Sequence, residues 1–225
     1  SGEQTVTGAI ASDTRAFASW LYNTALGRTS IDAGFWQFEV YCGVNSITAG
    51  RVTTITRQIY QVQVPAFTVT VSGVGANSRT VTSSGGTPFA VGGYFAASAT
   101  NTTASYIQTP SGLFQITART SDTQVTITVP TGYANDGAGS AFTLWNKLLS
   151  ATSFPITAIS PSYSLSTFST TQAAFTVALT DKLGAISFGT SNNTTTITLT
   201  YDGNARNTHF STPLITMHNN LAGLQ

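Results

Sequence analysis

The chain has 225 residues, of which only 8% are charged, and its formal net charge is +1. An ordinary soluble domain carries about 25% charged residues, so Ser, Thr, Gly and Asn supply most of this polar surface. The seven Arg and two Lys residues are scattered, which excludes the basic patch that nucleic-acid binding requires.

The same composition excludes an ordinary membrane protein. No apolar run approaches the roughly 20 residues that span a bilayer, and residues 1–8 lack the cationic start of a signal peptide. A net charge near zero leaves little repulsion between copies. This surface suits a protein whose faces are covered by neighbours in an assembly, or an extracellular domain with a neutral, hydroxyl-rich surface.

Residues 1–65 are expected to form long strands. Residues 5–10 alternate and fit an N-terminal arm or edge strand. The segment 35–44 has a uniformly apolar face, as a sandwich core requires, made of Trp36, Phe38, Val40, Cys42 and Val44. Residues 51–64 form a second long strand, and we expect the two strands to make an antiparallel hairpin. The single cysteine, Cys42, fits a buried inert thiol better than a nucleophile.

Residues 66–140 are richer in Gly and Ser and contain shorter apolar runs. Glycine-rich and Asn-rich turns separate these runs. The expected strands are 67–71, 80–82, 94–96, 113–118 and 124–129. We interpret the segment as a small β-barrel-like module inserted between strands of an outer domain.

The outer domain is expected to resume at residue 141. Residues 141–150 have apolar side chains at helical spacing, but the surrounding segments are strand-like, so we predict a strand. Further strands are expected at 154–159, 162–168 and 172–179. Residues 194–201 alternate cleanly, with Ile197, Leu199 and Tyr201 on one face and threonines on the other.

The C-terminal residues carry a resemblance. Residues 201–209, 211–214 and 218–225, the last reading HNNLAGLQ, are similar to bacteriophage virion appendage proteins of the tail-fibre and baseplate type. In those proteins a β-sandwich head leads into an HNxLxGLQ segment and a trimeric fibre. Residues 21–22, 33–41, 174–177 and 180–183 also resemble the head domains, so the similarity brackets the insert.

The resemblance, together with the strand pattern, implies an all-β chain with a jelly-roll-like antiparallel β-sandwich. Residues 1–65 and 141–212 would form the sandwich, 66–140 the inserted module, and 213–225 a linker or oligomerisation segment that runs on into a fibre. The implied role is structural: assembly within the virion and host-surface attachment, as part of a tail fibre, baseplate or head fibre. The expected partners are other copies, as a homotrimer, and other virion proteins.

The segment after Pro213 has no element long enough to bury its apolar side chains. Ordering such a segment costs about 1–2 kcal/mol per residue, so burial between chains is expected to hold it. The residues expected at this interface are Leu214, Ile215, Met217, His218, Leu221 and Leu224.

Catalytic groups are sparse, and we expect no enzyme and no cofactor. Most of the eight carboxylates stand at turn-like positions, where Asp accepts local backbone N–H bonds: Asp32, Asp122, Asp136, Asp181 and Asp202. Glu39 lies within a strand and fits a solvated or ion-paired face better than a general base. No G-x-S-x-G motif occurs. A glycan-degrading enzyme, the remaining catalytic alternative, would need two carboxylates about 5–10 Å apart in a groove.

The two histidines, His209 and His218, do not make a metal site by themselves. Such a site needs three or four ligands, and Asp202 is the only nearby candidate in sequence. Hydrogen bonding at the surface or between chains is the expected role. An axial metal held by His218 from each chain of a trimer is the lesser alternative.

Aromatic side chains suggest a second function, a non-catalytic carbohydrate-binding module for host recognition. Flat rings stack on sugar faces, although most aromatics of a sandwich are core residues. Candidates for sugar contact are Trp20, Tyr22, Tyr94, Tyr106, Tyr133 and Tyr163, of which Tyr94, Tyr106 and Tyr133 belong to or adjoin strands of the insert.

Overall fold

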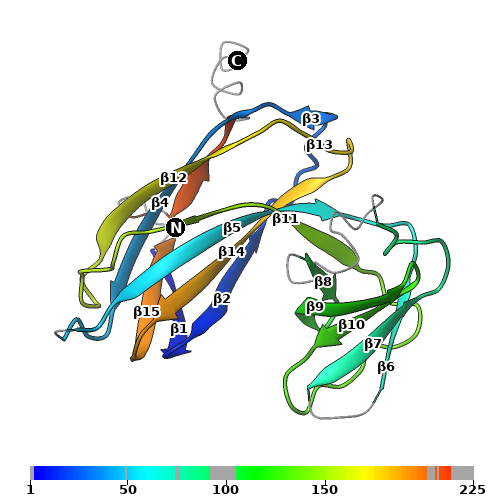
Figure 1. The fold of residues 1–225 in the computed structure, drawn as a ribbon, viewed down its shortest axis with the longest axis horizontal. Helices are drawn as coiled ribbons and strands as arrows, with labels where there is room; N and C mark the ends of the chain where they lie inside the picture. Colours follow the sequence, from blue (N-terminus) through cyan, green and yellow to red (C-terminus); the bar gives the residue numbers. More distant parts are fainter. Residues whose placement is uncertain are drawn as a thin grey trace.

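A computed structural model describes residues 3–48, 50–73, 77–91, 105–201, 206 and 208–213. Across these residues the fold is all-β, and its strand pairs are antiparallel (Figure 1). The sheets form a sandwich-like arrangement, as the strand pattern predicted; the jelly-roll connection order stays a prediction. Within these ranges there is no helix of the length and apolarity that a membrane span would need.

The smaller layer is a five-stranded sheet in which β4 holds the centre. The order is β1 (Gln4–Ala11), β15 (Thr194–Tyr201), β4 (Gly34–Val44) and β12 (Ser164–Gln172). A short strand, β16 (His209–Ser211), pairs with β4 as well. It follows β15 along the same edge of β4, because β15 pairs with residues 42–44 and β16 with residues 37–39.

The larger layer is a nine-stranded sheet that extends beyond the sandwich. Its strands, in spatial order, are β2 (Thr14–Leu21), β14 (Lys182–Ser191), β5 (Thr53–Gln63), β11 (Thr143–Thr152), β8 (Ser105–Thr109), β9 (Gly112–Ser121), β10 (Gln124–Thr128), β7 (Ser78–Ser83) and β6 (Val69–Ser72). A two-stranded ribbon of β3 (Ser30–Ile31) and β13 (Phe175–Thr176) completes the fold.

The main core fills the space between the five-stranded sheet and the β2–β14–β5–β11 part of the larger one. The predicted apolar face of β4 is fully buried there, from Trp36 to Val44. Ile55 and Ile59 of β5 meet this face from the opposite layer, with Ile197 and Leu199 of β15 beside them. The alternating pattern of the sequence therefore becomes a sandwich core, as expected of facing sheets.

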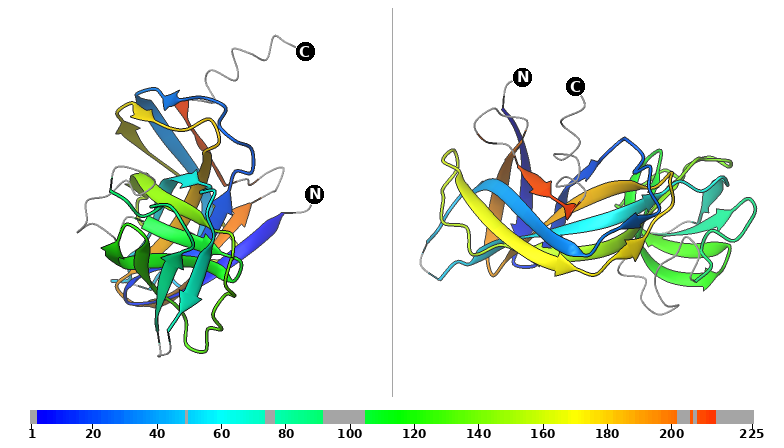
Figure 2. Two further views of the ribbon diagram at one scale, coloured as in Figure 1. Left: turned by 90° about the vertical axis from the view of Figure 1, so that its right-hand side faces the viewer. Right: turned by 90° about the horizontal axis from the view of Figure 1, so that it is seen from above.

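A second core belongs to strands β6 to β10. It contains Val69, Val81, Ile116 and Ile127, all completely buried, together with further apolar residues. These strands gather at one end of the molecule, at the lower right of Figure 1 and again at the right of the view from above in Figure 2. β11 connects the two cores, because Leu144 packs in the second core and Leu149 in the first.

Three strand predictions need correction. The hairpin of residues 35–44 and 51–64 is wrong, because β4 and β5 belong to different sheets and the loop between them crosses the sandwich. The strand predicted at 154–159 is also wrong, because residues 153–158 form no strand. The strand expected at 172–179 is divided: β12 continues to Gln172, and β13 covers only Phe175–Thr176.

The other predicted strands that fall within the described residues are present, several with shifted ends. Residues 141–150 form most of strand β11, so the choice of strand over helix is confirmed. Strand β8 (Ser105–Thr109) was not predicted. The strand expected at 94–96 lies outside the described residues.

Candidate functional site

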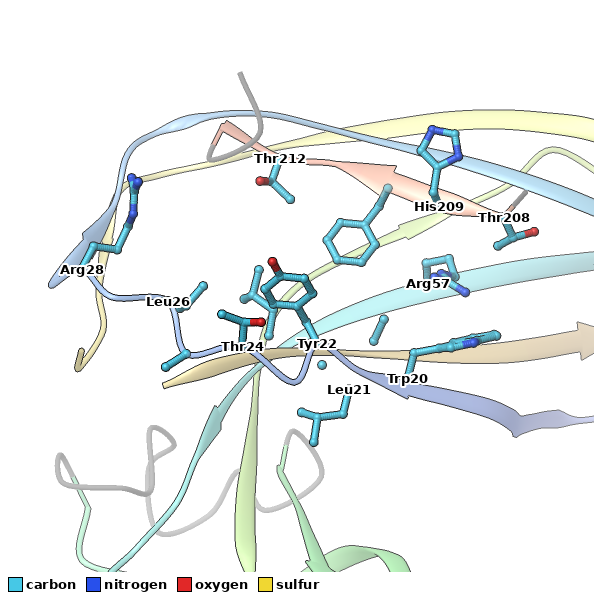
Figure 3. A pocket seen from close by; sticks show the side chains of 15 residues that line it. Trp20, Leu21, Tyr22, Thr24, Leu26, Arg28, Arg57, Thr208, His209 and Thr212 are labelled. Carbon is cyan, nitrogen blue, oxygen red and sulfur yellow. The ribbon is translucent and has the colours of Figure 1, made fainter. Parts of the chain in front are cut away.

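A cavity of about 540 Å³ opens between the two layers, beside the end of β2 (Figure 3). Its lining is drawn from β2, the 22–28 segment, β5, β14 and the 208–212 segment: Trp20, Leu21, Tyr22, Thr24, Ala25, Leu26, Arg28, Arg57, Leu183, Gly184, Ala185, Thr208, His209, Phe210 and Thr212. The volume lies within the range of about 300–1,000 Å³ that small-molecule sites occupy. We call it the interlayer cavity.

Backbone bonds fix the wall made by residues 22–28. The amide of Tyr22 donates to the carbonyl of Leu183 at 2.8 Å, and the amide of Leu26 donates to the carbonyl of Asp181 at 2.7 Å. Asp181 is 2% exposed, and its carboxylate accepts bonds from the Ala178 amide and from Gln61. The capping role predicted for Asp181 is present, but its partner Gln61 lies 120 residues away.

The opposite wall is the segment that leads into and through β16. The amide of Tyr41 donates to Thr208 Oγ1 at 3.1 Å. The ring of Phe210 lies between the two layers. It is stacked on the Trp36 ring, with centroids 6.2 Å apart, and tilted against the Phe38 ring, with centroids also 6.2 Å apart. His209 Nε2 lies 3.8 Å from Glu39 Oε2. Glu39 is partly exposed, and its contact with His209 is an ion pair only when the imidazole is protonated, so the solvated or ion-paired face expected for Glu39 stays a prediction.

Arg57 is the distinctive residue of the interlayer cavity. It is only 3% exposed, on the core face of β5, and its guanidinium carbon lies 4.6 Å from the centroid of the Trp20 ring. The Nη1 atom of Arg57 donates to Ser187 Oγ at 2.8 Å, but Nε finds no hydrogen-bond acceptor in the described part of the chain. Within the described residues, no carboxylate lies within 4.0 Å of its nitrogens.

Burial of Arg57 lowers the pKa of its guanidinium to about 10. At pH 7 the group therefore stays positively charged inside the protein. The described lining also contains Arg28 and includes no Asp or Glu. The site can accordingly attract and bind a negatively charged group.

Sequence reasoning missed Arg57, although a signal was present. Alternation within β5 places Arg57 on the same face as Ile55 and Ile59, which are completely buried. A cation on an otherwise apolar strand face is unusual, because Arg is almost never buried without a partner.

Two of the predicted glycan contacts, Tyr106 and Tyr133, do not line the interlayer cavity. Tyr106 is 8% exposed and packs edge-on against Tyr60 with centroids 5.7 Å apart, so it offers no free face to a sugar. Tyr133 is half-buried, and its hydroxyl donates to Asp136 at 2.5 Å. Sugar contact by Tyr133 stays a prediction, and Tyr94 lies outside the described residues. Of the wider set, Trp20 and Tyr22 both line the interlayer cavity.

Asp136 has a larger role than the local turn capping predicted for it. Its carboxylate accepts bonds from Thr109, Ser111 and Tyr133 at 2.5–2.6 Å. Burial opposes its ionisation, but hydrogen bonds from Ser111, Thr109 and Tyr133 outweigh this effect and hold the pKa of the carboxyl below its usual value. This network fastens the 130–137 segment to the turn between β8 and β9.

The remaining candidates do not form a metal centre in the part of the chain described. No three His, Cys, Asp or Glu residues there lie close enough to hold a metal ion. Cys42 is completely buried, and burial raises the pKa of its thiol to about 12, which agrees with an inert thiol. Asp202 and His218 lie outside the described residues, as do the predicted interface residues Leu214, Ile215, Met217, Leu221 and Leu224.

Compared with protein-family models, curated proteins and solved structures, the chain matches none of them significantly. The resemblance to phage appendage proteins is therefore carried by the residues of the similar segments alone.

Proposed function

We propose that this chain is a non-enzymatic structural protein of a bacteriophage particle, a component of a tail fibre, baseplate or head fibre. It contributes to assembly and to host-surface attachment. Residues 213–225 join copies of the chain, with threefold symmetry, and the sandwich faces other virion proteins.

The observation that carries this proposal is the convergence of the segments that resemble phage proteins. Three such segments contribute residues to the lining of the interlayer cavity. They are represented there by Leu21 and Tyr22, by Leu183, and by Thr208 and His209. A fourth segment forms β4, which pairs with β16. Segments up to about 190 residues apart in sequence thus build one structural unit, which supports their common origin in a head domain.

The end of the described chain supports a fixed exit from that domain. A Cβ added to Gly34 would lie 2.5 Å from Pro213 Cγ, so the backbone of β4 and Pro213 are in close contact. Residues 208–213 are therefore held against β4 before the chain enters its final segment. A docked exit of this kind can present residues 214–225 to neighbouring copies in a constant direction.

Truncation after Thr212 is expected to leave a folded but less associated protein. The full chain should show about three times the 23.5-kDa chain mass in multi-angle light scattering, and the truncated chain should be a monomer. Replacing Leu221 and Leu224 with Ser should also weaken association, because it removes apolar burial between chains. The length-matched control is Asn219→Ser, which should leave the mass unchanged. An identical oligomer from the full and truncated chains would contradict the proposed role of residues 213–225.

The second candidate function is a non-catalytic carbohydrate-binding module. The specific observation in its favour is the interlayer cavity, which places the aromatic residues Trp20 and Tyr22 beside cationic and hydroxyl side chains. Attachment to a host surface would join the two functions in one protein. The first concerns residues 213–225 and the second concerns the cavity, so each can be tested without the other.

A further inference from the structure

Among the described residues, Arg57 is a buried cation with no carboxylate within salt-bridge distance. Arg57 is 3% exposed, and its one hydrogen bond in the described structure goes to a neutral hydroxyl, that of Ser187. Its Nε–H has no acceptor among the described residues. Most buried polar groups are hydrogen-bonded, and buried charges are paired, so the folded protein bears an electrostatic cost here that an anion bound beside the guanidinium would reduce.

The surroundings of Arg57 make this arrangement a built site. Trp20 lies against the guanidinium at 4.6 Å, a geometry that holds a cation by its attraction to the ring. Ser187 stands directly opposite Arg57 in the pairing of β14 with β5. Figure 3 shows Arg57 between Trp20 on one wall and Thr208 and His209 on the other. The guanidinium is therefore fixed within the cavity that it lines.

The rest of the lining indicates the body of the ligand. Trp20 and Tyr22 provide flat rings on one side of the cavity, where Thr24 also lies, and Thr208 and Thr212 provide hydroxyl groups on the other side (Figure 3). A ligand with both C–H faces and hydroxyl groups can use both kinds of surface, since rings stack on its C–H faces and threonines bond to its hydroxyls. A simple alkyl chain would make no use of the threonine hydroxyls.

We propose that the interlayer cavity binds an acidic monosaccharide unit of a surface glycan, with the sugar carboxylate on Arg57 and the pyranose ring against Trp20 and Tyr22. A carboxylate is planar and matches the donors of a guanidinium, so it can accept N–H groups of Arg57 that other residues leave unused. This inference rests on the proposed attachment function and names its ligand class.

The test compares two ligands that differ in one group. Methyl glucuronide and methyl glucoside share the ring, but only the first carries a carboxylate. Isothermal titration of the unmodified full chain should show binding of the glucuronide, with at least tenfold weaker binding of the glucoside. Hexanoate, a carboxylate without a sugar ring, should bind more weakly than the glucuronide.

The protein variants locate the binding. Arg57→Gln should lower affinity for the glucuronide at least tenfold and reduce the preference over the glucoside. The matched control is Arg15→Gln, which removes the same charge from an exposed position on β2, where Arg15 pairs with Asp13. Trp20→Leu should weaken the binding of both sugars, because it removes the stacking surface. This variant tests the site even if Arg57→Gln lowers the yield of folded protein.

Equal affinity for glucuronide and glucoside, or no binding of either, would overturn the proposal. Tighter binding of hexanoate would overturn the sugar class, and unchanged affinity in Arg57→Gln would overturn the location. These outcomes are independent of light scattering on the truncated chain, because residues 213–225 contribute nothing to the described lining. A failure of this inference is therefore distinguishable from a failure of the assembly function.

Discussion

Phe38→Ala is expected to lower the free energy of unfolding by about 3–5 kcal/mol, the usual cost of truncating a fully buried Phe. Phe38 is completely buried in the main core. Its ring stacks on Phe168 of β12 with centroids 5.3 Å apart and lies 6.2 Å from Phe210 of β16. The substitution therefore opens a void where three strands of the five-stranded sheet meet.

Urea unfolding followed by fluorescence measures this change. The control in the same strand is Phe35→Ala, because Phe35 is 57% exposed and its removal should change stability by no more than about 0.5 kcal/mol. Similar losses for the two variants would mean that the alternation of β4 does not decide which face packs in the core. A loss below about 1 kcal/mol at Phe38 would contradict the burial of this face between two sheets.

Asp136→Ala is expected to lower the free energy of unfolding by about 2–3 kcal/mol. This is the range expected when hydrogen bonds to a charged group are lost and their donors stay unpaired. The substitution removes the common acceptor of Thr109, Ser111 and Tyr133. Loss of this acceptor should loosen the 130–137 segment. Hydrogen exchange should therefore increase around residues 105–111 and 130–137, while β4 and β15 keep their protection.

The same carboxyl predicts a dependence of stability on pH. The pKa of Asp136 is lower in the folded protein than its ordinary value near 3.9. The contribution of the Asp136 carboxylate to the free energy of unfolding is therefore fully present above the pKa of the unfolded state. It is lost as pH falls through the pKa of the folded state. In Asp136→Ala this part of the acid sensitivity should disappear, whereas the exposed-site control Asp32→Ala should retain it. Parallel pH profiles for all three proteins would contradict this role of Asp136.

The sequence was sufficient to predict which face of β4 enters the sandwich core. Period-2 alternation identified the buried face of β4 from Trp36 to Val44, and the structure buries that face completely. Alternation could not identify the partners of β4, because an apolar strand face fits any facing sheet. The expected hairpin with residues 51–64 failed for this reason: the connecting loop crosses between layers instead of turning within one.

The contents of the candidate site were harder to predict, because they depend on contacts between distant segments. His209 meets Glu39 only after β16 pairs with β4, across 170 residues. Arg57 was detectable in principle as a cation between Ile55 and Ile59, but its neighbours Trp20 and Ser187 come from other strands. For Tyr106 the sequence offered no such signal, because no local feature distinguished this buried tyrosine from an exposed one.

Particle composition is the decisive test of the proposal that this chain is part of an assembled phage particle. Particles from cells that produce the protein would be purified, analysed by peptide mass spectrometry and labelled with an antibody against the 66–140 module. We expect peptides of this chain in stoichiometric amounts and label at regular positions on an appendage. Particles that infect normally but contain none of these peptides would contradict the proposal.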